Sequence, residues 1–421
     1  MLHTYQALNY LQLADADAAR VELNRALQRQ RDAVAANAKR IEEARELAEK
    51  ASSEGVTDDQ GRKGDSYDVD RAKSDPRTAS GLASIESKID AALLPYGDYV
   101  NPFTTFLDAL VFTYQGTDAS DLERARKSWE RVVNFAPQNP YARADYIAVE
   151  PDLAPPGSAE PQLGSDSVPA SVAEPVATES AEPVAAAIPA SEATPEPAAA
   201  AVAADTPVAP QIPAPEAPPA TPASLTYVIY ETGSAPYRDQ VRIDIPLFLV
   251  TSGISYVGAA FPTIETVGAH AGPLQITTSD GASYPSALVA SMDSVVAQDF
   301  KNEWPTILTK TLISTATKAT IDAILQKQIQ DQAGAGGALL FKLATAVAQA
   351  AVNIADTRTW RSLPKEFHYA RLATPADGRL TLTAGGLSTT VVLEPAAVNV
   401  VYVKSPGAFA PLLASQFVLK K

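Results

Sequence analysis

The first 150 residues carry apolar positions at the three- and four-residue spacing of an amphipathic helix. The predicted helices cover residues 4–14, 16–52, 84–94, 102–114, 120–135 and 140–149. Asn101 and Pro102 form a start signal for the fourth helix, with Asn as the N-cap and Pro at the first helical position. Residues 52–80 are polar, with repeated Gly and Asp, and are expected to be a mobile loop. The pattern therefore predicts an all-α domain over residues 1–150.

Two pairs of these helices match the packing positions of the tetratricopeptide (TPR) repeat. Small residues at such positions let two antiparallel helices approach closely, and large residues fill the gap between them. The matching residues are Ala7, Tyr10, Ala19, Leu23 and Ala26 in the first pair and Ala125, Trp129, Val132 and Pro137 in the second. Two repeats are few for stable stacking, so a further helical segment is expected upstream. The helices are expected either to offer a groove to a protein partner or only to pack on one another.

Residues 151–224 have a composition that does not support a folded core. They hold 17 of the chain's 33 prolines and ten of its acidic residues, and they contain no Lys, Arg or aromatic residue. Such a stretch cannot bury enough apolar surface to offset the entropy of ordering its backbone. It is predicted to be a disordered linker that reaches from about 45 to about 230 Å, depending on how extended it is.

From residue 225 the pattern changes to the alternation of β-strands. Strands are predicted at residues 225–231, 240–250, 254–261, 274–277, 367–372, 379–383, 389–393 and 399–404, and helices at 287–300, 304–330 and 338–355. Strands, then helices, then strands predict an α+β domain over residues 225–421, with an antiparallel sheet and helices packed on one face.

The charge and the cysteine content exclude several classes of function. The net charge is −15, and because the predicted linker supplies ten negative charges, the rest of the chain is only mildly acidic. No basic stripe suggests nucleic-acid binding. The absence of cysteine removes disulfides and thiolate chemistry from the chain as written. No signal peptide is visible, and no stretch is long and apolar enough to span a bilayer.

Residues that could carry catalysis are few and scattered. The three histidines are His3, His270 and His368, and they lack the spacing of metal ligands. Gly334–Gly337 lacks the Lys-Ser/Thr ending of a phosphate-binding loop and is predicted to be a turn between helices. Three acidic residues lie on neighbouring helical turns, namely Asp293, Asp299 and Glu303. Helix-cap and surface roles are favoured for them over catalysis. We therefore predict neither a metal nor a cofactor, and no enzymatic activity.

The most unusual string is residues 355–364, Ala-Asp-Thr-Arg-Thr-Trp-Arg-Ser-Leu-Pro. Asp356 and Arg358 are expected to pair across a tight junction between a helix and a strand. Arg358, Trp360 and Arg361 are of the residue types enriched in interface hot spots, which makes them candidate partner-binding residues. The alternative is a structural corner that holds the preceding helix against the sheet.

Several motifs together resemble a family of bacterial TPR-containing envelope lipoproteins. They are residues 2–11, 19–26 and 29–30, residues 99–103, Tyr230-Glu231 with 241–247, and residues 355–365. The resemblance implies a Gram-negative protein on the periplasmic side of the outer membrane, made with a signal peptide and a lipid-anchored cysteine. It also implies a gene often encoded near a lipoprotein activator of peptidoglycan synthases. This chain departs from the family by lacking that N-terminal segment and by its long Pro/Ala linker.

These observations predict a non-enzymatic envelope adaptor. The TPR-like helices would hold a protein partner, such as an envelope or peptidoglycan-synthesis protein, and the tethered α+β domain would engage a second target. Membrane attachment would come only through a lipid anchor that this chain lacks. The alternatives are a cytosolic TPR adaptor and a cell-wall-related enzyme in the C-terminal domain.

Overall fold

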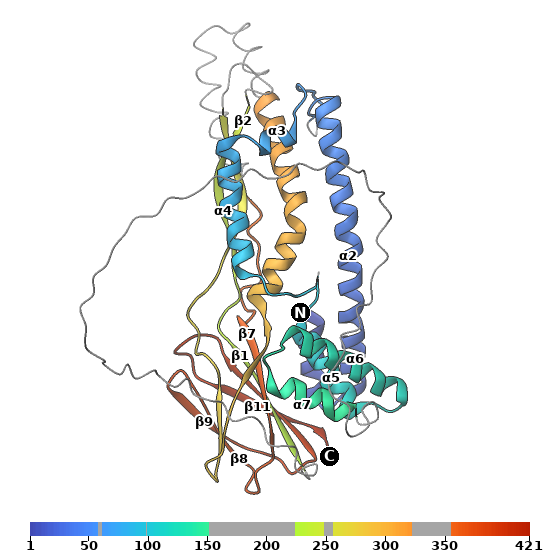
Figure 1. Ribbon diagram of the computed structural model, residues 1–421, viewed down its shortest axis with the longest axis vertical. Helices are drawn as coiled ribbons and strands as arrows, with labels where there is room; N and C mark the ends of the chain where they lie inside the picture. The colour runs from blue at the N-terminus through green and yellow to red at the C-terminus, as the bar shows by residue number, and fades with distance from the viewer. Residues whose placement is uncertain (58–60, 98, 151–223, 248–255, 322–354) are drawn as a thin grey trace, which may run out of the picture. The chain divides into compact units, whose positions relative to one another are not determined.

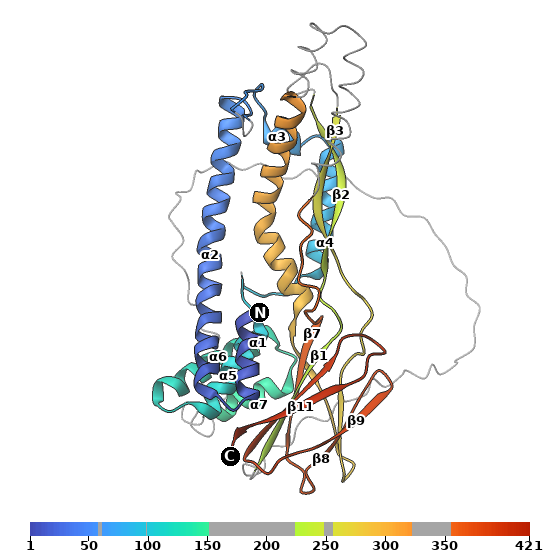
Figure 2. The same cartoon turned by 180° about the vertical axis from the view of Figure 1, so that it is seen from behind.

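The computed structural model describes residues 1–57, 61–97, 99–150, 224–247, 256–321 and 355–421. The predicted linker over 151–223, Gly334–Gly337 and nearly all of the predicted helix over 338–355 lie outside these residues. Met1–Leu153 and Pro222–Lys421 together form one compact unit. Within it the N-terminal region is helical and the C-terminal region is α+β, so the predicted fold class is confirmed (Figures 1 and 2).

The described N-terminal helices agree with the apolar spacing except between residues 52 and 84. They are α1 (Leu2–Gln12), α2 (Ala16–Ser53), α3 (Val69–Lys73), α4 (Pro76–Ala92), α5 (Pro102–Gln115), α6 (Ala119–Phe135) and α7 (Pro140–Val149). Asp15 caps α2 by accepting a hydrogen bond from the Ala18 amide at 2.9 Å. Asn101 caps α5 in the same way, with Pro102 at the first helical position, as the start signal predicts.

The stretch expected to be a mobile loop is largely built into the fold, which corrects the prediction for residues 52–80. It contains α3 and the first turn of α4, whose N-caps are Asp68 and Asp75. Val56 and Tyr67 are fully buried in a core cluster. Apolar residues are sparse here, so helical periodicity could not reveal the two short starts, although each is marked by an Asp cap.

The C-terminal region contains three sheets. Its strands are β1 (Leu225–Thr232), β2 (Tyr237–Pro246), β3 (Tyr256–Glu265), β4 (Gln275–Thr278), β5 (Ser283–Pro285), β6 (Ala287–Ser291), β7 (Glu366–Ala373), β8 (Arg379–Ala384), β9 (Leu387–Val392), β10 (Val398–Ser405) and β11 (Leu413–Lys420). A five-stranded sheet has the order β11-β10-β1-β7-β6, a four-stranded sheet has the order β5-β4-β8-β9, and β2 pairs with β3. The β1–β10 pair is parallel, which the prediction of an antiparallel sheet missed.

The central strand β1 of the five-stranded sheet is buried on both faces, and the strand alternation decides what each face contacts. In β1, Tyr227 and Ile229 join the core cluster that contains α1, α2, α5, α6 and α7. Val228 and Tyr230 join the cluster formed with the four-stranded sheet. The N-terminal helices and the C-terminal sheet therefore share one core, although the sequence pattern assigned them to separate domains.

A second core lies around the β2–β3 hairpin. Ile243, Ile245 and Phe261 of the hairpin pack with Leu82 of α4 and with Phe300 of a helix described over residues 292–321. Figure 2 shows this helix and α2 running side by side. The described part of this helix is continuous, where two helices with a break at 301–303 were predicted.

Two further boundaries differ from the sequence pattern. The helix begins at Met292 and not at residue 287, because residues 287–291 form β6. The strand β11 at the C-terminus was not predicted, because its first half is exposed and carries no clear alternation.

A buried carboxylate joins α7 to the five-stranded sheet. Asp145 accepts hydrogen bonds from the hydroxyls of Tyr227 at 2.7 Å and Tyr369 at 3.0 Å. The guanidinium of Arg371 lies 3.1 Å from the same carboxylate. Burial raises the pKa of Asp145 to about 6, although Arg371 and the two hydroxyls act in the opposite direction. This network extends to Tyr114 of α5, whose hydroxyl lies 2.8 Å from that of Tyr227.

The raised pKa of Asp145 predicts a dependence of stability on pH. A carboxyl whose pKa is higher in the folded state stabilises the fold fully below its unfolded value, and that stability is lost as the pH rises through the folded value. Relative to Asp145→Asn, the wild-type chain should therefore lose about 2–3 kcal/mol of unfolding free energy between pH 4 and pH 7. Urea unfolding of both proteins at the two pH values measures this difference. If the wild-type chain instead gains unfolding free energy relative to Asp145→Asn over this range, the ion pair with Arg371 lowers the pKa of Asp145 more than burial raises it.

Candidate partner-binding surface

The structure buries seven of the nine predicted TPR packing residues. Ala7, Ala19, Leu23 and Ala26 are buried in the first helix pair, and Ala125, Trp129 and Val132 in the second. Tyr10 is instead 36% exposed, and Pro137 is exposed as well. The buried face of α1 is made by Thr4, Ala7, Leu8 and Leu11, so Leu11 fills the position expected for Tyr10.

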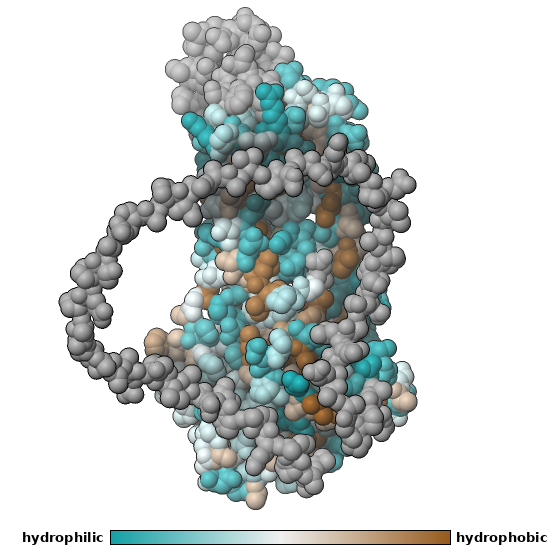
Figure 3. Space-filling model, viewed as in Figure 1, coloured by the Kyte–Doolittle hydropathy of each residue, from teal (hydrophilic) through white to brown (hydrophobic). Residues whose placement is uncertain are grey.

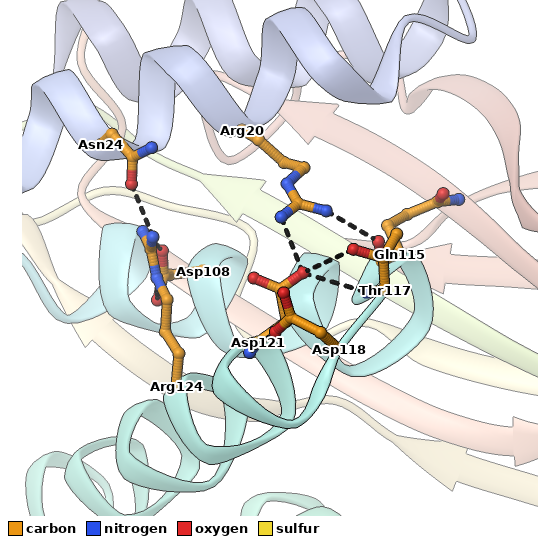
Figure 4. Close-up of polar contacts among 8 residues, drawn as sticks. All are labelled: Arg20, Asn24, Asp108, Gln115, Thr117, Asp118, Asp121 and Arg124. Atoms are coloured by element: carbon orange, nitrogen blue, oxygen red, sulfur yellow. Dashed lines mark hydrogen bonds and ion pairs between the residues drawn. The ribbon is translucent and has the colours of Figure 1, made fainter.

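A polar network that the sequence pattern did not reveal joins the two helix pairs (Figure 4). Arg20 of α2 contacts the carboxylate of Asp121 in α6 at 2.7 Å and donates to the carbonyl of Gln115 at 3.1 Å. Arg124 of α6 binds both carboxylate oxygens of Asp108 in α5, which is 1% exposed. Arg20 and Arg124 are each adjacent in sequence to a small residue of the TPR-like pattern, Ala19 and Ala125, but nothing local marks their acidic partners.

The face of the helices that a partner groove would use is covered by the chain's own sheet. Residues 102–112 of α5 are all buried. The ring of Phe103 stacks on Phe367 of β7, with centroids 3.7 Å apart, and Phe106 lies 4.5 Å from Tyr369. This face of the helices is therefore occupied by the chain itself.

Trp360 lies at the junction between α1 and the five-stranded sheet. Its side chain is 44% exposed, and its ring centroid is 6.4 Å from that of Tyr5. The Tyr5 hydroxyl donates to Glu231 of β1 at 3.0 Å. Lys404 of β10 contacts Glu231 at 3.1 Å and lies 5.3 Å from the centre of the Tyr5 ring. These contacts hold Tyr5 in place beneath one side of an exposed tryptophan.

The two arginines of the predicted string flank Trp360. Arg358 makes two hydrogen bonds to Asp356, at 2.7 and 2.9 Å, so the predicted pair is confirmed. These bonds lower the pKa of Asp356 to about 2. The guanidinium of Arg361 lies 5.5 Å from the ring centre of Tyr237. We call Tyr5, Arg358, Trp360, Arg361 and Lys404 the Trp360 surface.

The same string also makes a structural corner. Leu363 is buried, its carbonyl accepts from the Ala235 amide at 2.8 Å, and the Lys365 amide donates to Thr232 at 2.9 Å. Sequence reasoning singled out the arginines and Trp360 but missed Tyr5, Glu231 and Lys404. These three come from distant strands and α1, and only the fold brings them together.

The other residues considered for chemistry are mostly held in contacts with charged side chains. His3 contacts Glu22 at 2.6 Å, and Glu303 pairs with Arg238 at 2.8 Å. His270 and His368, far apart in the chain, both approach Glu366, at 3.6 and 2.9 Å. Within the described residues, no group of three or more His, Asp or Glu side chains has the arrangement to hold a metal ion.

Comparison of the chain with protein-family models, with characterised proteins and with solved structures finds no match. Among the described helices, none has both the length and the apolar character needed to cross a membrane.

Proposed function

We propose that this chain is a non-enzymatic adaptor of the cell envelope that binds a protein partner through the Trp360 surface. The observation that carries the proposal is the half-exposed indole of Trp360 beside Tyr5. Tryptophan, tyrosine and arginine dominate interface hot spots because they bury a large area with few flexible bonds. Tyr5 is already fixed by Glu231 and Lys404, so binding would require little further ordering.

A second contact surface is available on α2. Val34 and Ile41 are large, exposed apolar residues spaced seven positions apart, so they lie on the same face of this helix. Figure 3 shows hydrophobic residues among polar ones over the face that carries α2 and the helix at 292–321. Because the helices and the sheet share one core, the Trp360 surface and α2 would be presented at a fixed spacing. The proposal thus replaces two tethered binding domains by one body with two surfaces.

The envelope location is supported by the resemblance to bacterial TPR-containing lipoproteins. That resemblance also favours an envelope or peptidoglycan-synthesis protein as the partner. The sequence and the described contacts are equally compatible with the same adaptor chemistry in the cytosol, so the location is part of the test.

A photo-reactive amino acid in place of Trp360, in the full chain within its own cells, tests the proposal. We expect one discrete protein adduct in the envelope fraction. Arg358→Ala should reduce its yield several-fold without affecting the fold, since the Arg358 side chain is 91% exposed. The same probe in place of Leu122, an exposed apolar residue of α6, is the matched control.

The pattern of adducts decides between the outcomes. An adduct that forms equally from position 122, or no adduct from position 360, contradicts the proposed surface. An adduct found only with cytosolic protein would support the surface and overturn the envelope location.

A further inference from the structure

A cleft of about 610 Å³ is lined by none of the residues of the Trp360 surface. It is bounded by the end of α4, the end of β3, the start of the helix at 292–321 and the start of β7. The apolar part of its lining consists of Ala91, Ala92, Leu93, Leu94, Ile264 and Leu288. The charged residues that line it are Lys88, Glu265, Asp293, Lys365 and Glu366. Its volume is in the range of small-ligand sites.

The charges in the cleft are not balanced. Lys88 pairs with Glu265, and Lys365 pairs with Asp293. Among the described residues, Glu366 makes no salt bridge with a lysine and contacts the two histidines described above, although the charge of Lys365 also acts on it. Two lysines against three carboxylates leave one negative charge while the histidines are neutral.

The cleft also holds a buried hydrogen-bond acceptor that lacks a donor. Asp293 is 9% exposed, and its Oδ1 atom has no hydrogen-bond partner, because Lys365 contacts Oδ2. His368 and His270 both approach Oε2 of Glu366, which leaves Oε1 able to accept from a ligand. A buried acceptor without a donor is unfavourable, so a ligand that supplies N–H groups would be stabilised here.

We propose that this cleft binds an aliphatic primary amine in its ammonium form. The ammonium donates to Glu366 and Asp293 at the polar end, and the carbon chain lies along Leu93, Leu94 and Leu288. One positive charge offsets the excess carboxylate, and a chain of a few carbons matches the apolar part of the lining. This chemistry is shared by a free diamine and by the side chain of a lysine in a polypeptide.

An anionic ligand fits the site less well. The start of the helix at 292–321 and Lys365 would both attract an anion. However, the charge of Lys365 is already matched by Asp293, and Glu366 would lie beside the bound anion. The amine proposal does not depend on the Trp360 surface and can fail without affecting it.

Ligand-observed NMR titration of the full chain with pentylamine, pentanol and pentanoate tests the charge requirement. Pentylamine should bind at least tenfold more tightly than the other two, and methylamine should bind weakly because it cannot reach the apolar part of the lining. Titrations with 1,5-diaminopentane and with Nα-acetyl-lysine methylamide distinguish a free diamine from a lysine side chain. Whichever of the two compounds binds more tightly identifies the natural form of the amine.

Variants locate the binding in the cleft. Glu366→Gln should weaken pentylamine binding at least tenfold, and Glu303→Gln, outside the cleft, should leave it unchanged. Leu94→Ser, on the exposed lip, should weaken pentylamine about threefold and methylamine not at all. Equal affinities of the chain for pentylamine and pentanol would overturn the proposal. It would also be overturned if Leu94→Ser and a folded Glu366→Gln both bind pentylamine as tightly as the wild-type chain.

Discussion

Replacing Arg124 by Met is expected to lower the free energy of unfolding by about 3–5 kcal/mol, the usual loss when one partner of a buried ion pair is removed. Asp108 is almost completely buried, and both of its carboxylate oxygens accept hydrogen bonds from Arg124. Met keeps most of the side-chain volume over the Phe112 ring but leaves the carboxylate without a cation. Chemical unfolding followed by circular dichroism measures the loss.

Two further variants separate the buried charge from other effects. Lys127→Met, on the same helix, removes an exposed pair with Glu123 and should change stability by less than about 1 kcal/mol. Asp108→Asn combined with Arg124→Met should recover at least half of the loss, because the amide can still accept from Ser128 at a neutral site. A single Arg124→Met variant as stable as Lys127→Met would show that the network is solvated.

Replacing Phe103 by Ala is the second change with a large expected effect, and it should lower the free energy of unfolding by about 3–5 kcal/mol. The ring is fully buried between α5 and β7, where it stacks on Phe367. Its loss leaves a cavity at the place where the helices meet the five-stranded sheet. Since both regions share this core, helical and sheet signals should decrease together in one transition at lower denaturant concentration. Separate transitions would contradict a common core.

Local signals made much of the fold predictable. Asn101 and Pro102 mark a helix start where the structure has it. The alternation of Tyr227 with Val228 correctly indicated a strand, because both faces of β1 contact apolar cores. The same alternation could not show that one of those faces is covered by helices from before residue 150. That pairing depends on contacts between residues far apart in the chain, such as Phe103 and Phe367.

The candidate sites illustrate the same limit. Trp360 and its flanking arginines were identified from residue type alone, because their string is unusual on its own. Tyr5 and Lys404 carry no local mark, and only the fold places Tyr5 beside Trp360 and Lys404 beside Tyr5. His270 and His368 were set aside for their separation in sequence, yet Glu366 brings them together.

The most direct test of the shared core is to cut the chain within residues 151–223 and ask whether the halves stay together. A specific protease site introduced there separates the α-helical part from the α+β part without touching the described residues. The structure predicts that the two fragments co-elute in gel filtration as one species and dissociate more readily when Phe103 is Ala. Two separately eluting fragments, each keeping its own secondary structure, would contradict the account and restore two independent domains.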